Sequence, residues 1–70
     1  MDVFKLEGKP YIPLCDILKK VGFCQTGGHA KLVIADGLVK VDNEIELRKR
    51  CKIKEGQIIE FEGKRVKVEA

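Results

Sequence analysis

The apolar residues of this 70-residue chain change their spacing along its length. In the first half they recur at the i, i+3, i+4 and i+7 positions of one helix face, as Leu14, Ile17, Leu18 and Val21. In the second half, β-branched residues alternate with polar ones, which is typical of strands with one buried face. The pattern therefore predicts helices followed by strands, the order expected of an α+β fold.

Two short helices are predicted in the first half, after a short strand over 3–6 and a turn over 7–10. Pro13 suits the first turn of the first helix, and Gly22 suits the left-handed residue that follows a helix. The second helix has Thr26 as its N-cap and ends at Asp36-Gly37. Its buried stripe consists of Ala30, Val33 and Ile34.

Strands are predicted over 38–41, after the turn at Asp42-Asn43, and in a hairpin of 57–61 and 65–69. In the last strand Val66 and Val68 should face inward. Residues 48–54 have no clean period and are expected to form an irregular loop. We expect one α+β domain over residues 1–70, with two short helices packed on a small antiparallel sheet.

Positive charge is concentrated in the basic segment, residues 47–54. This segment holds five cations and no acid, whereas the whole chain carries only +3. Residues 17–35 also lack acids and contain three lysines. Because field strength depends on local charge density, this sorting indicates a surface that binds a polyanion. The cations of the segment are Arg48, Lys49, Arg50, Lys52 and Lys54.

The remaining composition argues against several classes of protein. Cys15, Cys24 and Cys51 are widely spaced and only one histidine accompanies them, so we expect reduced thiols, no metal site and no cofactor. No apolar run is long enough for a membrane span, and the N-terminus lacks the layout of a signal peptide. The sequence favours a soluble, cytoplasmic monomer.

One family resemblance covers most of the chain. It rests on Thr26-Gly27-Gly28-His29-Ala30-Lys31, on residues 32–43 after it, and on Gly56-Gln57-Ile58-Ile59. This order resembles the αL RNA-binding motif, the domain type named for small-subunit ribosomal protein S-four, and within it the small free-standing YbcJ-like proteins. Asp42-Asn43 replaces the family's Asn-Gly turn, Gly56-Gln57 replaces Gly-Asp, and Pro13 replaces an arginine of larger members.

The resemblance implies RNA binding by the second helix and the basic segment, without catalysis. Ribosomal or transfer RNA is the implied partner, which suggests a ribosome-associated bacterial protein. The candidate binding residues are Thr26, Gly27, Gly28, His29 and Lys31 of the helix, and Arg48, Lys49, Arg50 and Lys52 of the basic segment.

The chemistry of these residues supports that implication. A helix N-terminus offers unpaired amides and a positive dipole end, and glycines there let a phosphate approach. Two alternatives stay open: Thr26 either caps the helix or donates to a phosphate, and the glycines either clear space or form a turn. The four aromatic residues should mostly be needed in the core, so recognition is expected to read RNA shape and phosphates rather than stacked bases.

Three other functions compete with RNA binding. An enzyme could use Cys24, if the nearby helix N-terminus lowered its pKa. A protein-interaction module could use an acidic face made of Glu44, Glu46, Glu60 and Glu62. DNA binding needs the same phosphate contacts, but no helix rich in Arg, Asn and Gln is available for a major groove, which favours RNA.

Overall fold

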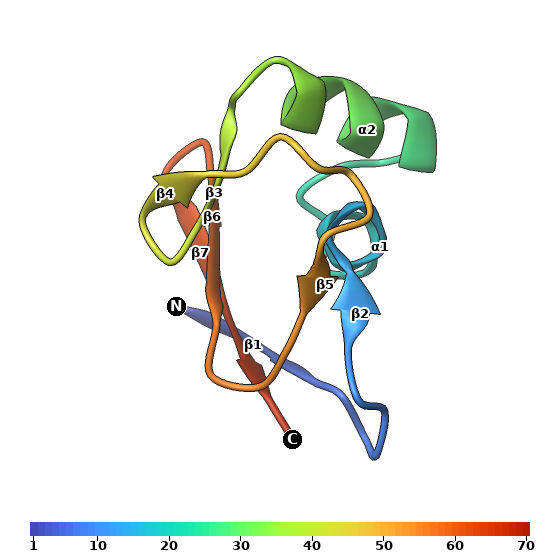
Figure 1. Ribbon diagram of the computed structural model, residues 1–70, viewed down its shortest axis with the longest axis vertical. Coiled ribbons are helices and arrows are strands. Elements are labelled where there is room, and N and C mark those ends of the chain that lie inside the picture. The colour runs from blue at the N-terminus through green and yellow to red at the C-terminus, as the bar shows by residue number, and fades with distance from the viewer.

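The helices and the main sheet lie on different sides of the molecule in a computed structural model that describes residues 1–70 (Figure 1). The strands are β1 (Asp2–Lys5), β2 (Ile12–Pro13), β3 (Val39–Val41), β4 (Glu44–Ile45), β5 (Lys52–Ile53), β6 (Ile58–Phe61) and β7 (Lys64–Glu69). The helices are α1 (Leu14–Lys20) and α2 (Gly27–Ala35). Neither helix is long and apolar enough to cross a membrane. The predicted α+β class, with two short helices, is confirmed.

The main sheet has five strands in the order β1-β7-β6-β3-β4. Its other pairs are antiparallel, but β1 runs parallel to β7, so the expected antiparallel sheet is wrong at this edge. Leu6 N–H extends the parallel pairing with a 2.8 Å hydrogen bond to the Glu69 carbonyl. The two strands lie at opposite ends of the chain, and residue alternation within each gives no information about their relative direction.

A separate two-stranded ribbon pairs β2 with β5 and sets Ile12 opposite Ile53. The prediction of an irregular loop over 48–54 is therefore wrong at Lys52 and Ile53. Two residues are too few to produce a recognisable period, so the pattern could not reveal this strand. Ile53 is fully buried and holds the basic segment to the core.

The core is wholly apolar. Eighteen side chains are buried and none of them is polar or charged. Val66 and Val68 face inward, as predicted, while their neighbours Arg65 and Lys67 are exposed. The helices add the predicted stripes of α1 and α2, so the core lies between the helices and one face of the sheet.

The predicted ends of both helices are confirmed, with one difference. Gly22 and Gly37 follow the two helices with φ of 83° and 75°, the left-handed conformation expected there. Pro13 lies one residue outside α1, as its N-cap, rather than in the first turn. Thr26 is the N-cap of α2.

The turn between β3 and β4 explains two departures from the family pattern. Asp42 and Asn43 both have positive φ, at 52° and 70°, as a tight two-residue hairpin requires. The Asp42 carboxylate accepts hydrogen bonds from Ile58 N–H at 3.0 Å and from the Gln57 side-chain amide at 3.3 Å. Gln57 also accepts from Lys54 N–H at 2.8 Å, so its amide joins the end of the basic segment to this turn.

Substitution of Ile53 by alanine tests how the basic segment is anchored. Removing a fully buried isoleucine side chain should cost about 2–5 kcal/mol, which approaches the roughly 3–5 kcal/mol that a core of this size supplies. Urea denaturation should therefore show a largely unfolded variant. The exposed Leu38→Ala should remain within about 0.5 kcal/mol of the unmodified protein, and equal stability of both variants would contradict the anchoring role.

Candidate nucleic-acid interface

Thr26 caps α2 with its side chain. Its hydroxyl oxygen accepts a 3.0 Å hydrogen bond from His29 N–H, and its carbonyl accepts the first helical bond from Ala30 N–H at 3.1 Å. The capping role is thus present. The hydroxyl keeps its own proton, so Thr26 can still donate to a ligand oxygen at the tip of the helix.

Gly27 and Gly28 are helical, so they are not turn residues. The other five glycines of the chain all have positive φ, which explains why glycine is used there. A methyl group on Gly27 would meet nothing within 4 Å, and one on Gly28 would lie 3.9 Å from the Thr26 hydroxyl. The fold therefore tolerates side chains at both positions, and alanine would favour the helix more.

These glycines leave two backbone donors uncovered. Neither Gly27 N–H nor Gly28 N–H donates to any group of the protein, and both residues lie at least partly open to solvent. Together with the dipole of a nine-residue helix, two adjacent uncovered amides form a site suited to an anionic oxygen. His29 and Lys31 are exposed on the same first turns, and Lys31 has no carboxylate within 4 Å.

The basic segment is fixed to the first turn of α1. Leu14 N–H donates to the Cys51 carbonyl at 2.9 Å, and Cys15 N–H donates to the Lys49 carbonyl at 3.0 Å. These amides have no acceptor within their own helix. The carbonyls of the basic segment supply the acceptors, and the same hydrogen bonds hold the segment against α1. Cys51 is half-buried and packs against the core, which adds to the buried anchor at Ile53.

Arg48 is held by a carboxylate, a contact that is not predicted from the sequence. Its Nε and Nη2 donate to the two oxygens of Glu46 at 3.0 Å each, and its backbone N–H donates to the same side chain at 3.0 Å. These hydrogen bonds lower the pKa of Glu46 to about 2. The Arg48 side chain is still 76% exposed, but its charge is neutralised, so it braces the segment more than it adds to the positive field.

The other four cations of the segment have no carboxylate within 4 Å: Lys49, Arg50, Lys52 and Lys54. All four are exposed. An open hollow of about 400 Å³ is lined by Arg48, Arg50, Cys51, Lys52 and Lys54. Lys54 is not among the binding residues predicted from the sequence, and its place in the hollow adds it to them.

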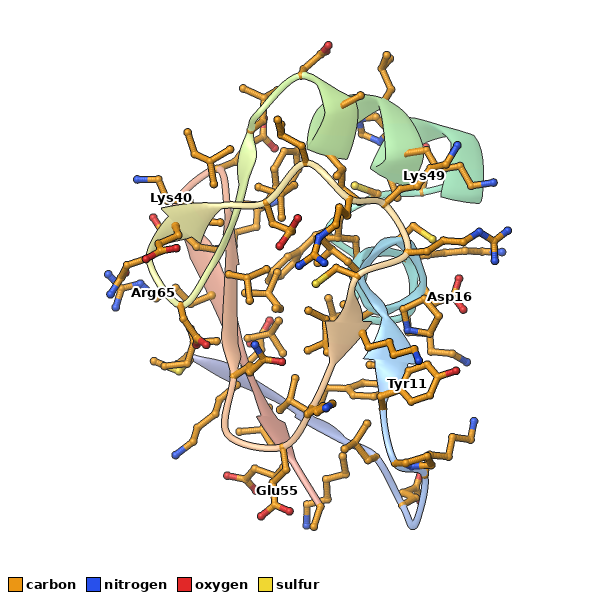
Figure 2. All side chains as sticks on the ribbon, in the orientation of Figure 1. Tyr11, Asp16, Lys40, Lys49, Glu55 and Arg65 are labelled. Atoms are coloured by element: carbon orange, nitrogen blue, oxygen red, sulfur yellow. The ribbon has the colours of Figure 1, made fainter.

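The basic segment begins beside the C-terminal end of α2. At its start, Leu47 Cδ2 lies 3.9 Å from a methyl group built on Gly37, just beyond the C-terminal end of the helix. The chain then crosses below α2 in the view of Figure 1 and turns down toward β5. Figure 2 labels Lys49 below the first turns of α2, on the side of the molecule away from Lys40 and Arg65.

Two acids of the possible acidic face, Glu46 and Glu60, are paired with arginines. Glu60 pairs across the sheet with Lys40 on one side and with Arg65 on the other, and its carboxylate lies 3.6 Å from Arg65 Nε. Glu46 belongs to the Arg48 contact described above. Glu60 is therefore flanked by two cations on the outer face of the sheet, and only Glu44 and Glu62 of this set are without an ion pair.

The thiol considered for catalysis is also in an unsuitable environment. Cys24 is only 2% exposed, and burial raises the pKa of its thiol, followed by the nearby Glu62 carboxylate. The condition for a catalytic Cys24, a lowered pKa, is not met, because the thiol packs into the core before α2 begins. A buried thiol with a raised pKa is a poor nucleophile.

The Arg48–Glu46 contact makes a testable pH prediction. Because the pKa of Glu46 is lowered from 4.5 to about 2, its charge stabilises the folded segment above pH 4.5, and this contribution is lost as the pH falls toward 2. An NMR titration of the Glu46 carboxyl should give a midpoint near 2, rising toward 4.5 in Arg48→Ala. A midpoint near 4.5 in the unmodified protein would contradict the contact.

Comparison with known proteins identifies the family of this chain. The S4 domain family matches residues 4–69 of the chain. YbcJ of Escherichia coli (strain K12) and YbcJ of Shigella flexneri are each 49% identical over 70 residues, covering 100% of both chains. The solution structure of E. coli YbcJ, described as revealing an αL motif involved in RNA-binding, is 48% identical with a TM-score of 0.78 and covers 100% of this chain and 89% of that one.

A more distant structure shares the fold alone. The 30S ribosomal protein S4e of Thermoplasma acidophilum is 24% identical with a TM-score of 0.67. The match covers 81% of this chain and 30% of that protein. The resemblance identified from the sequence is therefore confirmed: this chain belongs to the S4 domain family and has the fold of the αL RNA-binding motif.

Proposed function

We propose that this protein binds structured RNA, without catalysing a reaction, through the N-terminus of α2 and the basic segment. The observation that carries the proposal is a set of unneutralised donors: two uncovered amides at Gly27 and Gly28, and a run of cations without carboxylate partners. The involvement of the αL motif of E. coli YbcJ in RNA binding supports RNA as the polyanion.

The proposed mechanism is placement of phosphates rather than reading of bases. The α2 tip takes one phosphate through backbone amides and the Thr26 hydroxyl, with His29 and Lys31 at its rim. The basic segment takes the phosphates that follow, with Arg50 offering a planar fork and the lysines point charges. Because the segment is already fixed by α1 and by Ile53, little backbone freedom is lost on binding.

The RNA is proposed to be a folded ribosomal or transfer RNA, which would make this a ribosome-associated protein of the bacterial cytoplasm that acts as a monomer. The α2 surface presents no row of Arg, Asn and Gln that could read a DNA major groove.

Salt dependence tests the phosphate mechanism directly. If Lys31, Lys49, Arg50, Lys52 and Lys54 each contact one phosphate, log Kobs against log salt should have a slope of roughly −3.5 to −4.5. Binding of a hairpin RNA, followed by fluorescence anisotropy over a series of salt concentrations, measures this slope. A slope near zero would exclude the mechanism.

Charge neutralisation locates the binding surface. Lys49→Gln with Arg50→Gln should weaken binding by roughly 10- to 100-fold and reduce the salt slope by about 2. Lys40→Gln with Lys67→Gln removes two exposed cations from the sheet, neither of which has a carboxylate within 4 Å, and is the matched control (Figure 2 labels Lys40). Equal losses in both pairs would show that net charge, not the basic segment, determines binding. Arg48 is left intact, because its substitution would also release Glu46.

The glycines at the α2 tip give an independent test. Gly27→Ala with Gly28→Ala fits the fold and should leave the unfolding free energy unchanged or slightly higher. If a phosphate oxygen approaches the two amides, the added methyl groups should lower affinity by roughly tenfold or more, the cost of a charge-assisted hydrogen bond. Unchanged RNA affinity in this stable variant would remove the α2 tip from the interface.

A further inference from the structure

Tyr11 differs from the other three aromatic residues in its exposure. Phe23 and Phe61 are buried, and Phe4 is partly buried against the core, as expected for a chain with few aromatic residues. Tyr11 is 38% exposed and lies outside the core. Its hydroxyl makes no hydrogen bond within the protein, and the ring does not belong to the apolar core.

The ring lies at the edge of the basic segment. In the β2–β5 ribbon, Ile12 and Ile53 pair and face inward, which leaves Tyr11 and Lys52 on the outer side. Lys52 Nζ is 5.1 Å from the centre of the Tyr11 ring, within cation–π distance. Figure 2 shows Tyr11 at the solvent-exposed side of β2. An exposed aromatic ring is thus held beside one of the cations that have no carboxylate partner.

We propose that Tyr11 is a stacking platform for an unpaired RNA base, with Lys52 placed to contact the phosphate of that nucleotide. This inference rests on the proposed RNA-binding function and extends it to the class of RNA. The ligand is an RNA helix with an unpaired nucleotide at the point where the RNA contacts β2. Aromatic rings stack on any base and are electrostatically compatible with an adjacent cation, so this platform adds affinity without requiring a particular base.

The composition of the chain provides a direct optical test, because Tyr11 is its only tyrosine and it has no tryptophan. Two RNA probes share one stem sequence: a hairpin with unpaired loop nucleotides and a blunt duplex. Stacking should quench the tyrosine fluorescence with the hairpin and much less with the duplex. Free tyrosine amide added to the same RNA corrects for light absorbed by the bases.

Affinity measurements on three proteins complete the test. Tyr11→Leu keeps an apolar side chain without a stacking ring and should lose roughly 5- to 100-fold in affinity for the hairpin, with little change for the duplex. Tyr11→Phe keeps the ring and should bind the hairpin nearly as tightly as the unmodified protein. Far-ultraviolet circular dichroism should show all three proteins folded, since Tyr11 is not a core residue.

The outcomes separate this inference from the function on which it rests. Salt-dependent hairpin binding without quenching, or with unchanged affinity in Tyr11→Leu, would overturn the stacking role and leave RNA binding intact. Equal losses for the hairpin and the duplex would also overturn it, because the contact would then be to the backbone of the stem. Failure of the unmodified protein to bind either RNA would reject the proposed function itself.

Discussion

The structure depends on the two hydrogen bonds from the first amides of α1 to the carbonyls of Lys49 and Cys51. A run of five cations within eight residues repels itself and would favour an extended, mobile segment. Here the run passes over the N-terminus of α1, whose unpaired amides need acceptors. Ile53, within the same segment, is buried in the core. One arrangement therefore caps α1, closes the core and holds the cations outward.

This constraint gives a mechanical reason for the proposed affinity. Ordering a mobile backbone costs about 1–2 kcal/mol per residue, and a free loop would pay that cost when it binds. The Glu46–Arg48 contact has a similar effect. It neutralises one positive charge of the segment, but its hydrogen bonds stabilise the turn that presents Lys49 and Arg50. The segment has fewer available charges than the sequence indicates, but they are fixed in position.

The sequence predicts the local structure and the two hairpins, β3–β4 and β6–β7, but not the pairing of strands that are distant in the chain. Helix ends follow from residues with strong conformational preferences, such as Thr26, Gly22 and Gly37, and these predictions are confirmed. The parallel β1–β7 pair and the β2–β5 ribbon depend on contacts between distant residues, which alternation within a short segment cannot specify.

The candidate site shows the same division. The basic segment and the bare α2 tip are visible in the sequence because charge and glycine are local properties. The neutralisation of Arg48, the burial of Cys24 and the exposure of Tyr11 are consequences of the tertiary arrangement. Glu46 and Arg48 are only two residues apart in the sequence. Residues 46–48 contain no residue type typical of a turn, so the sequence does not predict that the two side chains meet.

The central claim is that the α2 tip and the basic segment contact RNA together. The most direct measurement is a titration of ¹⁵N-labelled protein with a hairpin RNA, following every backbone amide. The account predicts that the amides of Gly27, Gly28 and residues 49–52 shift together, with one binding curve. Shifts confined to the outer face of the sheet, around Lys40, Glu60 and Arg65, would contradict it.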